Sequence, residues 1–355
     1  MKTQTAILYQ SGPPPEKDGV QKPMKPGGYS DSGADVAYCL FSNEQEVVVP
    51  AASPDPANDY DWVFPDSEAG ITAALSAGAN VFWLNTVLYT GHPIETFFSE
   101  AIEIIGQHPD MVDLFDDKVF TNKRLAENKI DIPESYLIEE SNDLALLKDK
   151  LQYPVVIKPI RGRGSQGVAL VRNKEELSVR SEELLTSQNF GNAFYLERYL
   201  PGKEITITVM PPGKYRIREE EVVFEKHWSL PPVERFNHED GIAPYNGTVA
   251  VVNNSKVLTG DELKDEAVGR AMSQCEEAAA LVEARAPIRI DCRASAAGKY
   301  YLFDLNMKPN LTGASRKHRA DQDSLTTIAA RGIGWSYFDL LRNIAAQKWT
   351  PVAKS

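Results

Sequence analysis

Hydrophobic and polar positions alternate over the first part of the chain in a way that predicts strands and helices in turn. Strands are expected at residues 6–9, 46–49 and 80–84. Helices are expected at 31–42, after the capping pair Asp66-Ser67, and at 94–105. Alternation of this kind is typical of a parallel sheet covered by helices. We therefore expect residues 1–112 to form one α/β domain.

The pattern changes after residue 113 and divides the rest of the chain into two units. In residues 113–200 we expect helices at 117–128, 142–150 and 174–188, and strands at 168–171 and 194–200. Residues 201–355 contain an expected amphipathic helix at 261–283, a strand hairpin, and closing helices after Asp323 and Trp335. The sequence thus predicts a small central α+β domain and a larger C-terminal α+β domain, as the length of 355 residues allows.

The hairpin in the last unit is expected to bring two carboxylates together. Its strands are expected at residues 287–293 and 300–306. With the turn at Ala297-Gly298, four polar side chains share one face: Arg289 opposite Asn306, and Asp291 opposite Asp304. The other face is then expected to pack on the core through Ile288, Ile290, Cys292, Tyr301, Phe303 and Leu305.

Carboxylates at Asp291 and Asp304 would repel each other unless a cation lies between them. Asn306 adds a third oxygen on the same face, and such a set suits Mg²⁺, which binds oxygen ligands and keeps waters or substrate phosphates. The alternative is that both aspartates face water, as is usual on the polar face of an antiparallel sheet. The hairpin is therefore a candidate metal site.

Composition narrows the class of partner. The formal net charge is -12, which argues against a nucleic-acid partner because phosphate neutralisation requires a basic face. An anionic ligand must then be held by local groups. The chain has no run of about 18 apolar residues and no signal-peptide core at its start, so we expect a cytoplasmic protein. Its three cysteines are far apart and are expected to be buried thiols.

A glycine-rich segment, Gly162-Arg-Gly164-Ser-Gln-Gly167, follows Lys158 and precedes an expected strand at 168–171. The glycines do not open a helix, which excludes a dinucleotide-binding fingerprint, and the lysine precedes them, which excludes a protein-kinase loop. What remains is a strand-loop-strand flap whose backbone amides can approach phosphate oxygens. An ordinary surface hairpin is the alternative.

The segment from Phe194 to Val209 is expected to form a strand, a turn at Pro201-Gly-Lys203 and a second strand. Backbone groups between Glu197 and Leu200 could bind an adenine edge, and Glu204 could reach ribose hydroxyls, although both acids could also be solvated. Two loops are candidates for substrate recognition, residues 11–28 and 86–92. A third stretch, from Glu225 through Lys226 to His238, is expected to be either a lid or a surface excursion.

Several other side chains could contact substrate. His92 and His238 are the histidines best placed to do so, although a lone loop histidine is more often solvated. Arg316, Lys317 and Arg319 follow the second hairpin strand closely and could hold a substrate carboxylate, with a solvated helix start as the alternative.

The order of these features resembles the ATP-grasp superfamily, and within it the D-alanine–D-alanine ligases, over about residues 110–345. The resemblance implies an ATP-grasp fold with an N-terminal Rossmann-like domain (1–112), a central lid domain (113–200) and a C-terminal catalytic domain (201–355). It implies ATP and two Mg²⁺ ions as cofactors. It also implies small-molecule carboxylate and amine substrates such as amino acids, no membrane partner, and a possible homodimer.

The resemblance also implies roles for individual residues. The implied nucleotide-binding set is Lys118, Lys158, Gly164, Ser165, Gln166, Gly167, Glu197, Arg198, Tyr199, Leu200, Glu204 and Lys226. The implied metal ligands are Asp291, Asp304 and Asn306. Arg289 is implied to stabilise the tetrahedral intermediate, and Lys158 to act with it in catalysis.

Three departures from the family pattern bear on the substrate. Asp304 stands where members usually carry Glu, and this side chain, shorter by one methylene, is expected to bridge two ions less easily. Met307-Lys-Pro-Asn310 replaces a Ser-Pro-Gly turn, and Asn tolerates the positive φ that this turn requires. The N-terminal Glu-Arg-x-x-Ser element that receives the first D-alanine is missing, and the Pro/Gly loop with Tyr29–Gly33 takes its place.

The expected function is an ATP-dependent carboxylate-amine ligase that forms an amide through an acylphosphate and releases ADP and phosphate. One alternative is a ligase that joins an amino acid to a non-amino-acid acceptor, as mycosporine-type ligases do. Another is an ATP-grasp protein that binds nucleotide without turnover. The sequence names neither the acid nor the amine, and it leaves their chirality open.

Overall fold

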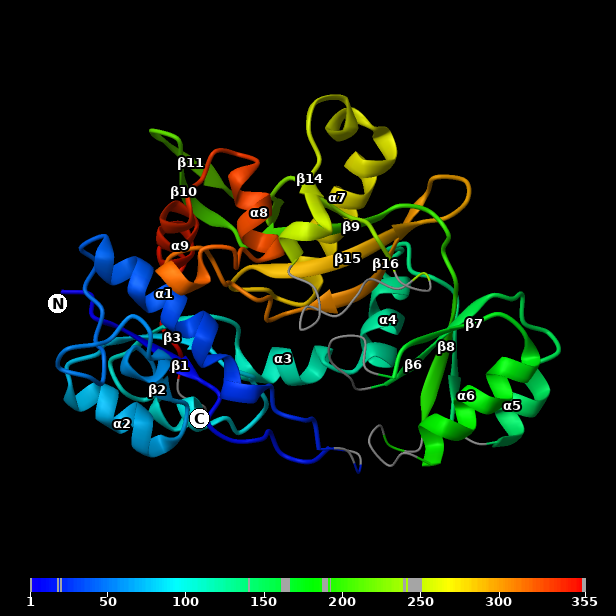
Figure 1. Cartoon of the computed structure of the whole chain (residues 1–355), viewed down its shortest axis with the longest axis horizontal. Coiled ribbons are helices and arrows are strands. Elements are labelled where there is room, and N and C mark those ends of the chain that lie inside the picture. Colours follow the sequence, from blue (N-terminus) through cyan, green and yellow to red (C-terminus); the bar gives the residue numbers. More distant parts are fainter. Residues whose placement is uncertain are drawn as a thin grey trace.

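The computed structural model describes residues 2–17, 19, 21–139, 141–160, 167–186, 191, 193–238, 241 and 251–352. The described strands form four sheets (Figure 1). An N-terminal parallel sheet, a central antiparallel sheet and a larger sheet built from the second half of the chain surround the middle of the molecule, and a two-stranded ribbon lies at the periphery. This mixture of sheets confirms the predicted α/β and α+β classes.

The N-terminal sheet is parallel throughout and is covered on both faces. Its order is β2 (Phe64–Pro65), β1 (Thr5–Tyr9), β3 (Val81–Asn85) and β4 (Glu103–Ile105). Ile7 packs in the core beside α1 (Ser30–Ser42), whereas its neighbours Ala6 and Leu8 pack in the core beside α2 (Glu68–Ser76). Successive side chains of a strand point to opposite faces, so one helix covers each face.

Two expected elements of this part of the chain are wrong. Residues 94–105 form a 3-10 turn, η3 (Pro93–Phe97), followed by strand β4, and not a helix. The reason is tertiary pairing, because the backbone of Ile104 exchanges hydrogen bonds of 2.8 and 2.9 Å with Trp349 near the end of the chain. The strand expected at 46–49 is reduced to a single bridge between Val47 and Thr5.

The central sheet is antiparallel, with the order β5 (Ser135–Ile138), β8 (Phe194–Arg198), β6 (Val155–Pro159) and β7 (Ala169–Val171). Helices α5 (Ser141–Leu147) and α6 (Lys174–Thr186) cover one face, as the right-hand end of Figure 1 shows. Two further helices, α3 (Pro109–Phe115) and α4 (Lys118–Glu127), lead from the N-terminal sheet to this one. Val156, Lys158 and Glu197 lie on the face of β6 and β8 that α5 and α6 do not cover, and this face borders the cavity described below.

The large sheet has the order β14 (Ser255–Val257), β13 (Val233–Arg235), β9 (Glu204–Met210), β15 (Ile288–Ala294) and β16 (Tyr300–Asn306), with β12 (Trp228–Ser229) pairing to β9. Helix α7 (Glu266–Leu281) packs on one face through Val268, Ala271 and Cys275. Helices α8 (Leu325–Arg331) and α9 (Tyr337–Ala345) join α1 in another core. Helix α8 covers part of the face opposite α7, where Thr326 hydrogen-bonds Thr208 of β9, and another part of that face borders the cavity described below.

The remaining elements are short. Strands β10 (Gly213–Ile217) and β11 (Glu220–Phe224) form the ribbon. The other 3-10 turns are η1 (Pro26–Tyr29), η2 (Asp59–Asp61), η4 (Val251–Asn253), η5 (Gly260–Lys264) and η6 (Lys317–Arg319). The helix expected at 261–283 is thus divided into η5 and α7. Within the described ranges, no helix combines the length and apolar character that crossing a membrane requires.

The hairpin of β15 and β16 has the predicted register at its polar end and a different one at its turn. Asp291 pairs with Asp304, but Cys292 pairs with Leu302, so Phe303 is an extra residue in a β-bulge. The turn has Gly298 at φ +83°, and the Gly298 N–H donates to the Ser295 carbonyl at 2.9 Å. A turn of this type uses one residue more than the predicted two-residue turn.

The bulge moves two aromatic side chains to the other face. Leu302 and Tyr300 are buried in the α7 core, where Phe303 and Tyr301 were expected. Phe303 instead lines the cavity described below, and Tyr301 stacks against Arg198 at 4.9 Å. The predicted face was therefore wrong for Tyr301 and Phe303, because a one-residue shift in register inverts every side chain beyond it.

Candidate nucleotide and metal site

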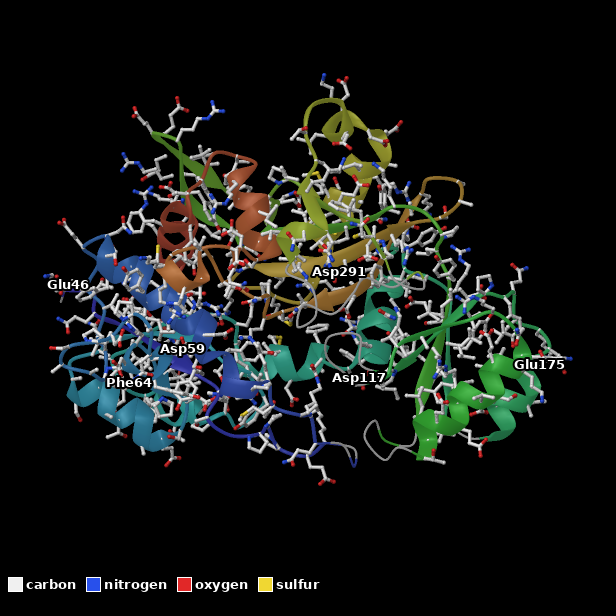
Figure 2. The ribbon with its side chains drawn as sticks, in the orientation of Figure 1. Glu46, Asp59, Phe64, Asp117, Glu175 and Asp291 are labelled. Atoms are coloured by element: carbon white, nitrogen blue, oxygen red, sulfur yellow. The ribbon has the colours of Figure 1, made fainter. Side chains whose placement is uncertain are left out.

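A cavity of about 790 Å³ lies where the three large sheets meet. Its walls come from the N-terminal loop, helices α3 and α4, one face of β6 and β8, and the polar face of the large sheet. Figure 2 labels Asp291 on the large sheet and Asp117 at the start of α4, both near the middle of the molecule. Asp117 accepts a hydrogen bond from the Phe120 N–H at 2.9 Å and so fixes the first turn of α4, where Lys118 stands.

Strand pairing arranges the polar side chains of the large sheet in three rows. The first row is Arg235, Glu204 and Arg293, the second is Thr206, Asp291 and Asp304, and the third is Thr208, Arg289 and Asn306. Neighbouring strands are about 4.8 Å apart, so side chains in one row can share a ligand. The four hairpin residues predicted to share a face do so, and all four line the cavity.

Asp291 is held from two sides. Its carboxylate accepts a hydrogen bond from the Thr206 hydroxyl at 2.8 Å and two from Arg289, through Nε at 3.2 Å and Nη2 at 3.1 Å. Burial raises the pKa of Asp291, and the Arg289 charge offsets part of that increase. The same contact fixes the orientation of Arg289. A rigid cation and a rigid anion are thus presented side by side.

Asp304 is paired with Lys118, which reaches it from the first turn of α4. Burial by itself would raise the pKa of Asp304, but the charge and hydrogen bond of Lys118 outweigh it and the pKa is lowered. Asp304 therefore stays ionised with a cationic group beside it. Asn306 accepts a hydrogen bond from the Lys308 N–H at 3.0 Å, which keeps its side-chain oxygen in place at the strand end.

Lys158 and Glu197 form a buried ion pair between β6 and β8. The Lys158 Nζ lies 2.5 Å from Glu197 Oε1 and 4.9 Å from the centre of the Phe303 ring. Burial raises the pKa of Glu197, and the Lys158 charge counteracts this. The second oxygen, Glu197 Oε2, is buried and has no hydrogen-bond donor among the described residues. A ligand with an N–H group could supply one.

The expected adenine hinge and ribose acid also line the cavity. Arg198, Tyr199 and Leu200 follow Glu197 along its edge. Glu204 is buried, and its Oε2 accepts a hydrogen bond from His238 Nε2 at 2.9 Å. His238 therefore lies beside the predicted ribose ligand Glu204, although it does not itself line the cavity.

Five predicted nucleotide-binding residues are not placed in this cavity. Gly164, Ser165 and Gln166 lie outside the described residues, and Gly167 is described but does not line the cavity. Lys226 is exposed, follows β11 and does not line the cavity. The reason is the next strand, β12, which pairs with Val209 and Met210 at the end of β9 opposite Glu204.

The two loops expected to recognise substrate border the cavity. The first contributes residues 14–17 and 22–26, and the second residues 87–90. Lys17 pairs with Asp113 at 2.9 Å and Lys22 pairs with Asp116, so the first loop is attached to α3 and to the residue that ends it.

Two other candidates for substrate contact are structural. His92 is fully buried, with Nε2 at 3.3 Å from Asp66, and it does not line the cavity. Arg316 is buried and binds Asp35 at 2.8 Å and Asp59 at 2.7 Å, so it joins the C-terminal segment to α1. Arg319 does line the cavity, beside Asp31 and Asp35.

Sequence reasoning missed two side chains of the site. Arg235 is buried in the first row and lines the cavity, but on the sequence it was only one charged residue in a possible lid. Phe303 was assigned to the core. The alternation Val233-Glu-Arg235 does place Arg235 on one face with Val233, but nothing in the sequence gives the strand order that sets it beside Glu204.

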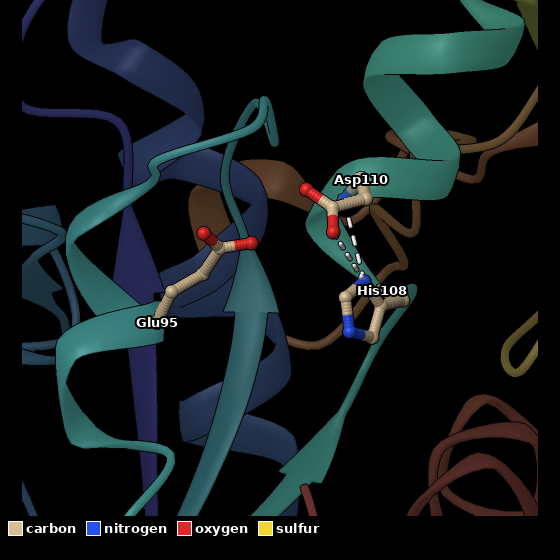
Figure 3. Close-up of side chains that lie close together, drawn as sticks. All are labelled: Glu95, His108 and Asp110. Carbon is tan, nitrogen blue, oxygen red and sulfur yellow. Dashed lines mark hydrogen bonds and ion pairs between the residues drawn. The ribbon is translucent and has the colours of Figure 1, made fainter. Parts of the chain in front are cut away.

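A second group of possible ligands lies away from the cavity. Oxygen and nitrogen atoms of Glu95, His108 and Asp110 are within 4.8 Å of one another (Figure 3). The His108 Nδ1 accepts a hydrogen bond from the Asp110 N–H at 3.3 Å, and its ring stacks on Trp349 at 5.8 Å. These contacts cap α3 and attach the end of the chain, so the group is explained by the fold.

Comparison with known proteins identifies the family. A family model described as the D-Ala–D-Ala ligase C-terminus matches residues 132–345, which is more than half of the chain. The chain belongs to this family. The D-alanine–D-alanine ligase of Marinomonas sp. is 22% identical over 250 residues, covering 70% of each chain. D-alanine–D-alanine ligase A of Bacillus cereus is 28% identical over 226 residues, 63% of this chain and 65% of that one.

The α-aminoadipate–LysW ligase LysX of Saccharolobus solfataricus is 28% identical over 135 residues, and the match spans only about half of that relative, 49%. Among solved structures, the Bacillus anthracis D-alanine–D-alanine ligase complexed with ATP has a TM-score of 0.64 at 18% identity, covering 97% of this chain and 96% of that one. VanG D-Ala:D-Ser ligase of Enterococcus faecalis also has a TM-score of 0.64, at 14% identity, with coverage of 98% and 99%. The fold is therefore that of the ATP-grasp ligases over the whole chain.

Proposed function

We propose that the protein is an ATP- and Mg²⁺-dependent ligase that joins a carboxylate to an amine through an acylphosphate. The observation that carries the proposal is the cavity itself. Oxygen ligands on two neighbouring strands face a pair of lysines and a buried glutamate across one space. The family, whose named members are ligases, supports the same reading.

The residues at the hairpin fit a magnesium ion. Asp291, Asp304 and Asn306 offer carboxylate and amide oxygens, the ligands that Mg²⁺ binds best. In the ligand-free protein each carboxylate is paired with a cationic side chain, Arg289 or Lys118, which stands in for a metal charge. When bound, Mg²⁺ would offset the charge of the phosphate oxygens. The structure supports the ligand set and leaves the number of ions to experiment.

The remaining residues fit a nucleotide. The backbone from Arg198 to Leu200 would bind the adenine edge, and the unsatisfied Glu197 Oε2 would accept a hydrogen bond from an amino group of the base. Glu204 would bind ribose hydroxyls after His238 is displaced. Lys118 and Lys158 would then hold phosphate oxygens. The polyphosphate would lie between Glu204 and the hairpin carboxylates.

The chemistry follows from this placement. A substrate carboxylate oxygen attacks the γ-phosphorus, the bond to ADP breaks, and an acylphosphate forms. The amine then attacks the acyl carbon and phosphate leaves. Arg289, held in place by Asp291, would offset the charge of the tetrahedral oxyanion, a contribution of about 3 kcal/mol for a donor of this kind. Lys158 would hold charge on the phosphoryl group during its transfer.

Substrate-dependent ADP release tests the proposal. The purified protein is incubated with ATP, Mg²⁺ and pairs of carboxylates and amines, and ADP is measured together with the mass of the ligated product. We expect at least one pair to raise ADP release and to yield an amide, and Asp291→Asn to abolish both. Arg270→Gln, which removes an exposed side chain from the protein surface, is the control and should retain activity. If no pair stimulates ATP turnover, the ligase proposal fails.

A second candidate is a ligase whose acceptor is not an amino acid. The observation in its favour is the Pro/Gly loop, which borders the cavity where the family element for the first D-alanine is missing. Comparing D-alanine, L-amino acids and non-amino-acid acceptors in the same assay separates the two candidates. Nucleotide binding without any ligated product would instead indicate a protein that has lost turnover.

A further inference from the structure

Arg235 combines burial, charge and missing partners in the wall of the cavity. It ends strand β13, its side chain is among those that line the cavity, and the residue is 7% exposed. Its Nε and Nη2 atoms are both buried and have no hydrogen-bond partner within the part of the chain that the structure describes. A buried guanidinium with two unsatisfied donors is costly for a folded protein.

Its neighbour Arg293, in the same row of side chains, has hydrogen-bond acceptors for its guanidinium donors. Arg293 donates to the carbonyls of Gly202 and Gly241 and to the hydroxyl of Tyr199. Arg235 lies on the other side of Glu204, and no described residue offers such acceptors to its Nε and Nη2. The two arginines therefore differ in partners although they share one row of one sheet.

The two unsatisfied atoms form one edge of the guanidinium group. Nε–H and Nη2–H point the same way, and this edge binds both oxygens of a carboxylate or phosphate. Arg289 uses the same pair of atoms to bind Asp291. The vacant edge of Arg235 is thus suited to an anion with two oxygens.

The charged groups around Arg235 indicate which anion its guanidinium could bind. Burial lowers the pKa of Arg235, while the nearby carboxylates of Asp291 and then Glu204 act against this effect, and Arg289 acts with it. The guanidinium therefore lies within the field of both the proposed metal ligand and the proposed ribose ligand. In the proposed function the polyphosphate of the nucleotide spans these two acids.

The geometry points to Arg235 as an additional phosphate-binding residue, which donates Nε–H and Nη2–H to oxygens of the nucleotide polyphosphate. This inference rests on the proposed function, since it requires a nucleotide in the cavity. Arg235 would then be a third cation beside the two predicted lysines, Lys118 and Lys158. The phosphate oxygens would accept the hydrogen bonds that its buried Nε–H and Nη2–H do not make with the described residues of the ligand-free protein. Because the guanidinium is already buried before binding, little further desolvation is needed.

A series of nucleotides provides the test. Binding of ADP, AMP and adenosine is measured by titration calorimetry in Mg²⁺ for the wild-type protein, Arg235→Met, Arg235→Lys and the surface control Arg270→Met. We expect Arg235→Met to weaken ADP binding about 10- to 100-fold and adenosine binding less than twofold, because a bidentate, charge-assisted contact is lost. Arg235→Lys keeps the positive charge but loses the paired N–H donors of the guanidinium. Its ADP affinity should therefore lie between those of the wild type and Arg235→Met.

The melting temperature without nucleotide distinguishes binding from a structural role. Removing a buried charge with unsatisfied donors should leave the ligand-free melting temperature of Arg235→Met unchanged or higher, whereas loss of a structural residue would lower it. Equal ADP affinity in wild type and Arg235→Met overturns the inference and leaves the proposed function intact. A loss of affinity that is equal for ADP and adenosine in Arg235→Met also overturns the inference. A wild-type protein that binds none of the three overturns both.

Discussion

The ion pair between Lys158 and Glu197 makes a prediction that needs no substrate. The side chains are 9% and 4% exposed, and their charged atoms are 2.5 Å apart. Replacing Lys158 with Met leaves a carboxylate at this depth without its counter-charge. Removal of one partner from a buried pair is strongly destabilising, whereas removal of both can be nearly neutral. Lys158→Met is therefore expected to be less stable than Lys158→Met/Glu197→Gln.

The size of the difference follows from the proton that Glu197 would bind. The ordinary pKa of a glutamate is 4.5. Holding this group protonated in the folded variant at pH 7 costs about 1.36 kcal/mol for each of about 2.5 pH units, which is about 3.4 kcal/mol. At pH 5.5 the same reasoning gives about 1.4 kcal/mol. These values are upper limits, because any remaining charge stabilisation from Lys118 reduces them.

The sign is fixed by linkage. Burial raises the pKa of Glu197 in the folded protein above its unfolded value, and removal of Lys158 raises it further. The stability of Lys158→Met should then be greatest below pH 4.5 and decline as the pH rises toward the folded pKa. The double variant has no titrating group at this position. It should lack this part of the pH dependence.

Urea denaturation of the ligand-free proteins, followed by circular dichroism at pH 5.5, 6.5 and 7.5, measures this difference. We expect the single variant to fall below the double variant by an amount that grows by at most about 1.4 kcal/mol per pH unit. A single variant as stable as the double variant at pH 7.5, or a deficit that does not change with pH, would refute the reasoning.

Three other predictions concern the hairpin and the core. Asp304→Asn removes a proposed metal ligand, so the Mg²⁺ concentration for half-maximal ADP release should rise at least about tenfold, and an unchanged requirement contradicts the assignment. Phe303→Ala should weaken ADP binding, measured by calorimetry, about tenfold, because its ring lies in the cavity. The matched variant Tyr301→Ala should leave ADP binding unchanged, and equal effects of the two variants would contradict the observed bulge. Arg316→Met leaves Asp35 buried without its closest partner and should cost about 3 kcal/mol in urea denaturation, and a loss under about 1 kcal/mol argues against a structural role.

The chemistry of the site was predictable where local patterns determine it. Alternation along residues 287–293 and 300–306 was sufficient to pair Asp291 with Asp304. The capping residues Asp117 and Ser67 were sufficient to start α4 and α2. In each case the cause lies within a few residues of its effect.

The errors arose where contacts with distant parts of the chain determine the secondary structure or the neighbours of a residue. Strand β4 was predicted as helix because its pairing with β3, and with Trp349 more than 200 residues away, leaves no local mark in the sequence. Phe303 was assigned to the core because a bulge leaves no reliable mark in an alternating pattern. Lys226 does not line the cavity, and the pairing of β12 with the far end of β9 could not be foreseen from the sequence. Arg235 was overlooked for the same reason, since strand order gives it its neighbours.

Transfer of oxygen from the acid to phosphate tests the central claim most directly. The carboxylate of the substrate pair that gives the most ADP is labelled with ¹⁸O on both oxygens, and the inorganic phosphate released is analysed by mass spectrometry. The account predicts one ¹⁸O in each phosphate and one ADP for each amide formed, because the carboxylate oxygen attacks the γ-phosphorus and leaves with it. Amide formation with unlabelled phosphate, or with AMP in place of ADP, would contradict it.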